Sequence, residues 1–311
     1  ESGNVDEARQ SMAEIQVAQE SINEARIRVG TSGPSLEDGK KRMDEEKAEE
    51  YLTQAGEEAL KSSASSEALH YYQEALDLYL KKYEEKAEPE KLAMFEKNIA
   101  LALSNKGEYE DALVYFDSAL QWYGIKPSQN KIFMLTKLLF NLLNVILNVY
   151  FPSKRSQKIP THKDSEIINL SHKKGEILVL QNPMRYFIEA IEEIKRLLRF
   201  DFRKIENWYH MLLSGSGLFA YSGFSFRLSN KFLEYGEGII DRNNFQQCYN
   251  FKHFKLIHNI CSGKWEDIQD YDEFLIDENL RVGQIHEVSI YIFLYGLVKI
   301  NQGEFNLACP L

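Results

Sequence analysis

The pattern of apolar and polar positions predicts an all-helical chain. No stretch alternates apolar and polar residues over the length of a strand, which argues against a sheet. Good helix formers fill the first 29 residues, and a highly charged helix is expected after residue 40. The expected helices cover residues 1–29, 40–63, 67–87, 90–105, 109–123, 134–151, 184–199, 203–213, 225–236, 244–261, 265–275 and 283–300.

Turn-forming residues separate these helices. Residues 30–39 are rich in glycine and predict a linker, and residues 152–163 contain two prolines and predict a loop. Pro183 follows Asn182 and is suited to the first position of a helix. Ser65 and Ser66 are candidate N-caps for the helix that begins near residue 67.

A short pattern recurs along the chain. It consists of a glycine, a residue two positions later that is usually aromatic, and an aliphatic residue or alanine three positions after that. The copies are Gly107-Tyr109-Ala112, Gly263-Trp265-Ile268 and Gly303-Phe305-Ala308, with weaker copies at Gly223-Ser225-Leu228 and Gly3-Val5-Ala8. The last three glycines are 40 residues apart, and a fixed period in this range is typical of a solenoid.

The physical role of each position follows from helix geometry. The glycine ends one helix by adopting left-handed backbone angles that other residues resist. The aromatic residue begins the next helix and packs back against the first. The small or aliphatic residue allows the two helices to approach closely. Such helix pairs have apolar faces that they bury only by stacking on neighbouring pairs.

Two segments resemble tetratricopeptide repeats. Ala68, Tyr72 and Ala75 have the spacing of the small, aromatic and alanine positions of that family's second helix, and Gly56 stands where its first helix has a glycine. The same spacing returns 44 residues later, at Ala112, Phe116 and Ala119. The repeats of 40 to 44 residues resemble the extended repeats of large regulatory ATPases, including the maltose-type transcription activators.

A second resemblance concerns the parent architecture. Residues 51–60 and 67–76 look like the junction after the ATPase module in multidomain signalling proteins, in which a nucleotidyl cyclase or kinase domain precedes an ATPase and helical repeats follow. Residues 95–100, 271–275 and 278–281 are also similar to that repeat region. The resemblance covers residues 47–311 and implies a right-handed superhelical solenoid of antiparallel helix pairs. Residues 1–46 form a separate N-terminal helical segment and linker in this interpretation.

The ends of the chain suggest a fragment of a longer protein. The chain begins at Glu1 rather than Met, and it stops at Leu311 a few residues into an expected helix. We therefore expect the repeat domain to be truncated at its C-terminus.

Composition narrows the class of protein. The net charge of −10 disfavours binding to nucleic acid. The three cysteines, Cys248, Cys261 and Cys309, form no CxxC pair, which favours a reducing, cytoplasmic compartment without a disulfide framework. No N-terminal segment has the pattern of a secretory signal.

The apolar segment from Met134 to Phe151 is the only one that could imitate a membrane span. Its Lys137, Asn141, Asn144 and Asn148 recur at intervals of four, three and four, which places one polar stripe along the helix. Four such groups argue against a helix that faces lipid. We interpret the segment as a buried solenoid helix.

Motifs of catalysis are missing from the sequence. It contains no GxxxxGK[ST] loop, no GxGxxG after a strand, and no HExxH, EF-hand or GxSxG motif. His253, His258 and Cys261 form a loose cluster, but the two histidines are five residues apart and do not share a helical face. Acidic runs such as Glu192-Glu193 lie beside lysines and indicate solvated helix faces. We therefore predict no cofactor, no metal and no catalytic residue.

Two segments are candidates for binding. The basic residues between 154 and 174 could contact an acidic peptide, a nucleotide phosphate or RNA, although a solvated loop is the simpler interpretation; they are Lys154, Arg155, Lys158, Lys163, Lys173 and Lys174. Tyr221, Phe224, Phe226 and Arg227 surround a Ser-Gly turn and either line a concave groove or pack in the core.

Three functions are compatible with these observations. The first is a scaffold that binds a protein or peptide or a neighbouring domain of the same polypeptide, with no nucleic acid or membrane as partner. The second is a regulatory sensor arm of an ATPase, cyclase or kinase whose catalytic domains lie outside this chain. The third is an enzyme with its site in the helical core.

Overall fold

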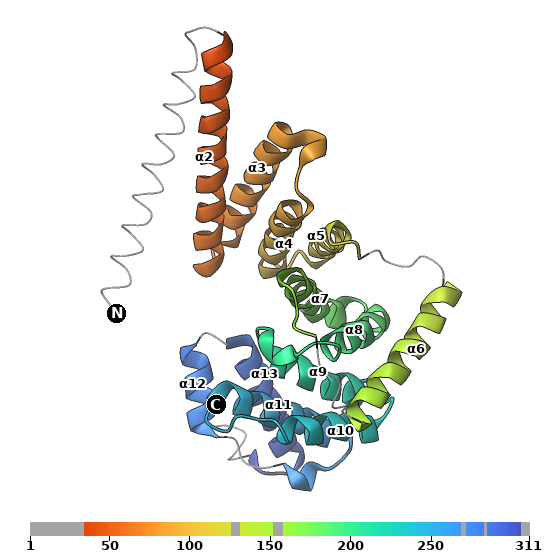
Figure 1. Cartoon of the computed structure of the whole chain (residues 1–311). Coiled ribbons are helices and arrows are strands. Elements are labelled where there is room, and N and C mark those ends of the chain that lie inside the picture. The colour runs from red at the N-terminus through yellow and green to blue at the C-terminus, as the bar shows by residue number, and fades with distance from the viewer. Residues whose placement is uncertain (1–33, 126–130, 152–157, 269–271, 283–284, 306–311) are drawn as a thin grey trace. The chain divides into compact units, whose positions relative to one another are not determined.

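The computed structural model describes residues 34–125, 131–151, 158–268, 272–282 and 285–305. These residues form twelve α-helices and three short 3-10 helices, and their only β-structure is an isolated bridge between Lys158 and Phe200. The all-helical prediction is therefore confirmed (Figure 1). The chain divides into two units, Glu1–Pro127 and Ser128–Leu311, and α2 runs without a break through residues 46 and 47.

The described part of the first unit contains four helices that pack in sequence order, each against the next. They are α2 (Pro34–Lys61), α3 (Ser65–Tyr83), α4 (Pro89–Asn105) and α5 (Tyr109–Trp122). A 3-10 helix, Glu84–Lys86, leads from α3 toward α4, where Pro89 occupies the first turn. The Glu88 N–H donates to the Tyr79 hydroxyl at 3.0 Å and fixes this connection.

The residues that resemble tetratricopeptide positions lie between these helices. Ala68, Tyr72 and Ala75 on α3 are fully buried. Gly56 on α2 faces the Tyr72 ring so closely that a Cβ would lie 2.8 Å from it, which explains why a residue without a side chain is needed there. The second set, Ala112, Phe116 and Ala119 on α5, is also buried.

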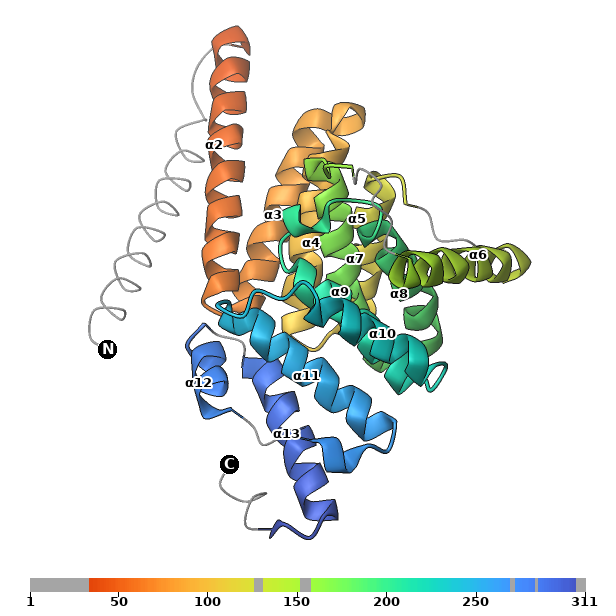
Figure 2. The same ribbon diagram turned by 60° about the horizontal axis from the view of Figure 1, so that its bottom comes forward.

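The second unit contains eight helices. They are α6 (Lys131–Tyr150), α7 (His162–Gln181), α8 (Pro183–Leu197), α9 (Trp208–Tyr221), α10 (Phe226–Glu237), α11 (Phe245–Cys261), α12 (Glu273–Arg281) and α13 (Ile285–Asn301). From α7 to α13 each helix packs against the next, whereas α6 contacts α8 and α10. The helices α9, α11 and α13 also contact one another in turn (Figure 2). Three apolar clusters form the core of this unit, and they succeed one another from α6 toward α13.

Side-chain caps fix where several of these helices begin. Thr161 and Asp164 form a capping box at α7, and Asn182 accepts the Arg185 N–H ahead of Pro183 at α8. Three more helices begin with a cap of the same kind; the capping residues are Ser225, Asn244 and Asp272.

The repeated glycines occupy the predicted corners. Gly107, Gly223, Gly263 and Gly303 all have positive φ, between 63° and 81°. Each follows a helix and precedes the next turn of helical chain, so the predicted left-handed backbone is confirmed at all four. At Gly107 the glycine N–H donates to the Ser104 carbonyl and the next N–H donates to the Leu103 carbonyl, both at 2.9 Å, which satisfies the end of α4. Gly3, Val5 and Ala8 lie outside the described residues, as does Ala308.

Several predicted boundaries are wrong, among them those near α2, α9 and α12. Residues 34–39 belong to α2 rather than to a linker, because Pro34 suits a first helical turn and the acidic residues after it suit a helix N-terminus. A helix was expected over 203–213, but Asn207 has a left-handed φ of 54° and α9 begins at Trp208. A helix was also expected over 265–275, where the chain forms only the 3-10 turn Trp265–Asp267 before Asp272 caps α12.

The copy of the repeat at residue 263 is therefore incomplete. Trp265 does pack back, because its indole N–H donates to the Ile260 carbonyl of α11 at 3.0 Å. Ile268 is partly buried and packs against the cluster that includes Tyr249 and Tyr291. Gly263 has the same left-handed backbone as the other glycine corners, but a short 3-10 turn stands where the repeat pattern predicts a helix.

The corner between α2 and α3 offers a test, because a serine occupies the left-handed position there. Ser63 has φ of 61°, and the N–H of Ala64 donates to the Ala59 carbonyl at 2.8 Å, as at the glycine corners. Replacing Ser63 by glycine is expected to raise the free energy of unfolding by about 0.5–1 kcal/mol, since glycine adopts this backbone without strain. Urea unfolding followed by circular dichroism measures the change. Ser62→Gly, one residue earlier, is the control and is expected to lower the same quantity.

Candidate docking surface

One face of α6 is apolar and exposed. Leu135, Leu139, Phe140 and Leu143 are each between 54% and 61% exposed, and Leu147 and Phe151 continue the row. The leucines and Phe151 recur every four residues, so they form a single ridge along the helix. We call Leu135, Leu139, Phe140, Leu143, Leu147 and Phe151 the α6 ridge. Figures 1 and 2 both show α6 at the margin of its unit.

The opposite face of α6 holds the helix in place. Leu142, Val145 and Val149 are buried in the apolar cluster that includes Ile191 and Ile194 of α8. The helix contacts α8 and α10. The prediction of a buried helix therefore holds for the face that carries Leu142, Val145 and Val149, and it is wrong for the face that carries the α6 ridge. Among the described residues no helix is long and apolar enough to cross a membrane.

The polar stripe of α6 points in an unexpected direction. Lys137 forms an ion pair with Glu192 of α8 at 2.7 Å, and the buried Asn141 accepts a hydrogen bond from Lys195 at 2.7 Å. Asn144 and Asn148 donate to carbonyls of their own helix. The polar groups thus face the protein or the helix backbone, and the leucines are left toward solvent.

Basic side chains border the α6 ridge. The ammonium of Lys195 lies 5.0 Å from the centre of the Phe140 ring, and that of Lys231 lies 5.6 Å from the Tyr150 ring. The pKa of Lys195 is lowered by burial, and by the nearby cations of Lys137, Arg196 and Arg199, against the opposing effect of Glu192. More positively than negatively charged side chains therefore lie within electrostatic range of Lys195, at the edge of the α6 ridge.

The predicted basic segment does not form one surface. Lys154 and Arg155 lie outside the described residues, and Lys158 is exposed ahead of α7. Lys163, Lys173 and Lys174 belong to α7. The loop was expected to extend to residue 163, but it ends at Thr161, so the basic run continues on a helix.

Two lysines of that run pair with carboxylates of the same chain. Lys173 forms an ion pair with Glu176 at 2.9 Å. Lys174 is buried and forms an ion pair with Glu189 of α8. Buried pairing of this kind leaves Lys174 facing the interior, so it is not part of an outer binding surface.

The aromatic turn after α9 is exposed rather than buried. Tyr221 and Phe224 are exposed, and Phe224 lies with its ring centre 5.8 Å from that of Phe187. Phe226 is also exposed and meets His258 edge-on. The residues form a second, smaller apolar patch at a helix corner, without a row that follows a helix axis.

Buried polar groups in the second unit include side chains that sequence reasoning did not select. The hydroxyl oxygens of Ser216 on α9 and Ser229 on α10 are 3.0 Å apart and share a hydrogen bond. The Ser229 hydroxyl also lies 2.8 Å from Nδ1 of His258 on α11. A hydroxyl beside an imidazole is the pairing of nucleophile and base in hydrolases. Both serines are fully buried, so no substrate reaches them, and the network joins three helices instead.

A row of histidines crosses the same unit. Nδ1 of His172 on α7 donates to the Glu193 carboxylate at 2.9 Å, and the His172 ring meets that of His210 on α9 edge-on, with ring centres 5.3 Å apart. His253 of α11 stacks on Tyr249. No group of three or more histidine, cysteine or acidic side chains in the described part of the chain could hold a metal ion, and the His253, His258 and Cys261 cluster does not converge.

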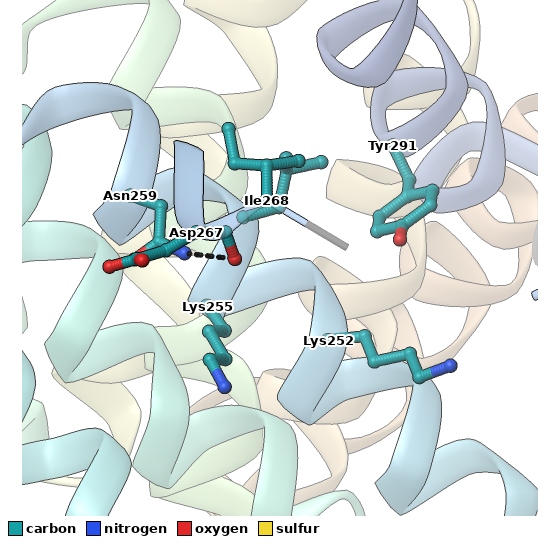
Figure 3. Close-up of a pocket in the computed structure, with 7 residues that line it drawn as sticks. Lys252, Lys255, Asn259, Asp267, Ile268 and Tyr291 are labelled. Carbon is teal, nitrogen blue, oxygen red and sulfur yellow. Dashed lines mark hydrogen bonds between the residues drawn. The ribbon is translucent and has the colours of Figure 1, made fainter. Parts of the chain in front are cut away.

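The best-formed cavity in the described residues is small (Figure 3). It measures about 30 Å³, which is room for water and not for an organic substrate. In Figure 3 Tyr291 and Ile268 border it, and the Asn259 amide donates to the Asp267 carbonyl at 3.3 Å. Lys252 at its edge is paired with Asp272 at 2.9 Å. This cavity therefore offers no site for an organic ligand.

No protein-family model matches the chain, and no curated protein matches it significantly. The resemblance to tetratricopeptide repeats therefore remains a prediction from the residues quoted above.

Proposed function

We propose that this chain is a non-catalytic module of stacked helix pairs, of the tetratricopeptide type, that binds other proteins. The observation that supports the proposal most strongly is the α6 ridge. Large apolar side chains exposed in a continuous row are uncommon outside interaction sites. Single exposed leucines are ordinary, but here five exposed apolar side chains follow one another at intervals of four residues.

The repeat geometry gives secondary support. Left-handed glycine corners and the buried Ala68-Tyr72-Ala75 and Ala112-Phe116-Ala119 sets are the features that tetratricopeptide arrays use to stack helices. Stacked helices present extended surfaces for binding rather than enclosed pockets. The regulatory-arm hypothesis is compatible with the same proposal, because a sensor arm also acts by docking.

A peptide-display selection tests the proposal. Peptides of about 20 residues are selected on the full chain, and their affinity is then measured for the chain and for the double variant Leu139→Gln/Leu143→Gln. Glutamine keeps helix propensity while removing apolar contact. We expect the selected peptides to bind the double variant at least tenfold more weakly, because two central side chains of the α6 ridge are lost.

Matched controls separate docking from general stickiness. Val114→Gln on α5 and Leu180→Gln on α7 remove equally exposed apolar side chains elsewhere. Both are expected to leave affinity unchanged, and circular dichroism should show all variants folded. Selected peptides that bind the double variant as tightly as the parent chain, or a selection that enriches none, would contradict the proposal.

A further inference from the structure

We propose that the α6 ridge binds an amphipathic helix of a partner protein whose apolar face is flanked by acidic residues. This inference rests on the proposed function and specifies the chemistry of the partner. It draws on the shape of the ridge, on the charge of its rim and on the composition of α6 itself.

The shape of the surface favours a helix as occupant. Side chains four residues apart form the ridges that fit into the grooves of another helix. From Leu135 to Phe151 the ridge spans sixteen residues, or about 24 Å at 1.5 Å per residue. A partner helix of four to five turns therefore matches its length. The narrow α6 ridge fits into the groove between two side-chain rows of a partner helix, whereas a flat partner surface would contact only its crest.

The rim favours acidic flanks on that helix. Lys137, Arg196 and Arg199 all lie within electrostatic range of Lys195. The carboxylates in range of these four cations are fewer; they are Glu192, Glu193 and Asp164. Lys195 and Lys231 also lie over ridge-side aromatic rings. An acidic residue on the partner would reach these cations while its apolar face covers the leucines. The basic rim is a local feature of a chain whose net charge is −10.

The composition of α6 disfavours a second copy of the chain. Residues 131–150 contain two lysines and no aspartate or glutamate. Two copies packed ridge to ridge would bring cations together without a carboxylate from either α6. Like charges at an interface oppose association. A partner with the opposite charge pattern removes this conflict.

Three designed probe peptides test the inference. Each has leucines at positions i, i+3, i+4 and i+7 of a sixteen-residue helix, with flanking positions that are all glutamate, all glutamine or all lysine. Fluorescence anisotropy measures their affinity for the full chain at low and high salt. We expect the glutamate probe to bind at least tenfold more tightly than the lysine probe at low salt, with a smaller difference at high salt.

Variants assign the effect to the rim. Lys137→Gln/Arg199→Gln is expected to reduce the preference for glutamate over lysine at least threefold while leaving the affinity of the glutamine probe unchanged. Lys106→Gln on α4 of the first unit is the matched control and should change neither. Leu139→Gln/Leu143→Gln should weaken all three probes, which confirms that they occupy the ridge.

Several outcomes would overturn the inference, and they differ from failure of the proposed function. Equal binding of the three probes, or strongest binding of the lysine probe, would remove the acidic partner but leave docking on α6. A dimer in sedimentation that Leu139→Gln/Leu143→Gln abolishes would identify a second copy as the occupant. Flotation with anionic vesicles that depends on the same leucines would identify a membrane surface. Binding of no probe would also contradict it.

Discussion

Replacing Gly215 by valine is expected to lower the free energy of unfolding by about 3 kcal/mol. Gly215 lies in the middle of α9, and a Cβ there would be 2.6 Å from the ring of Phe232. Phe232 is fully buried and stacks on Phe219, so it has no free space to move into. Overpacking a closed core site of this kind costs about 1–3 kcal/mol or more, which outweighs the gain in helix propensity over glycine. Chemical denaturation of the full chain measures the effect.

A second substitution tests whether Phe232 is the cause. Phe232→Leu alone should be destabilising, because it removes a buried ring. Combined with Gly215→Val, it should cost less than the sum of the two single changes, since the leucine leaves room for the new side chain. Gly238→Ala is the control, because its Cβ would meet only ordinary contacts at 3.6 Å. A strictly additive double variant would show that the strain lies elsewhere.

Acidification from pH 7 to pH 4 is expected to destabilise the second unit through its buried histidines. Burial lowers the pKa of His210 to about 3, assisted by the nearby His172 and His253, and burial lowers the pKa of His253 to about 4. The unfolded chain binds protons at these sites near pH 6.5, whereas the folded chain does not. The stability that they contribute is therefore complete above pH 6.5 and is lost as the pH falls below it.

His172 acts in the opposite direction. Burial alone would lower its pKa, but the carboxylates of Glu193 and Glu176 outweigh that effect and raise it above the usual value. Its contribution is present below pH 6.5 and is lost as the pH rises through its folded pKa. The pKa of the buried His258 is also lowered, by burial and by the cation of Lys264. Three lowered groups against one raised group leave a net loss of stability in acid, of roughly 3 kcal/mol or more by pH 4.

The melting temperature as a function of pH tests this balance. Besides the two other histidines, Lys173 and the Asn250 amide influence His210. His210→Phe should reduce the fall in melting temperature between pH 6.5 and pH 4, because the variant has one buried base fewer to protonate. His70→Gln on α3 replaces an exposed histidine and serves as the control. An unchanged pH profile in His210→Phe would show that other groups cause the acid sensitivity.

Local signals made the corners of this fold predictable. A glycine with a left-handed backbone needs no distant partner to be recognised, and Gly107, Gly223, Gly263 and Gly303 all have that backbone. The start of α12 has a local signal as well, since Asp272 is a good N-cap residue and its side chain accepts the Leu275 N–H.

The orientation of α6 could not be read in the same way. A polar stripe on a helix ordinarily faces solvent, yet Lys137 and Asn141 pair with Glu192 and Lys195, more than fifty residues later in the chain. A single sequence does not show which long-range partners will satisfy a polar side chain. The candidate binding surface therefore emerged only once the packing of α6 against α8 and α10 was known.

The Ser216, Ser229 and His258 network determines how three helices align along their axes. If α9, α10 or α11 slipped by one turn, two hydroxyls and an imidazole would lose their partners in an apolar interior. Each unsatisfied group would cost about 1–3 kcal/mol, so slipped arrangements are heavily penalised. Leucines in place of Ser216, Ser229 and His258 would also be buried, but they would allow the helices to shift along their axes, because apolar contacts have no fixed partner atoms. These few polar atoms thus give the array a single register, which any surface that must present side chains at fixed intervals requires.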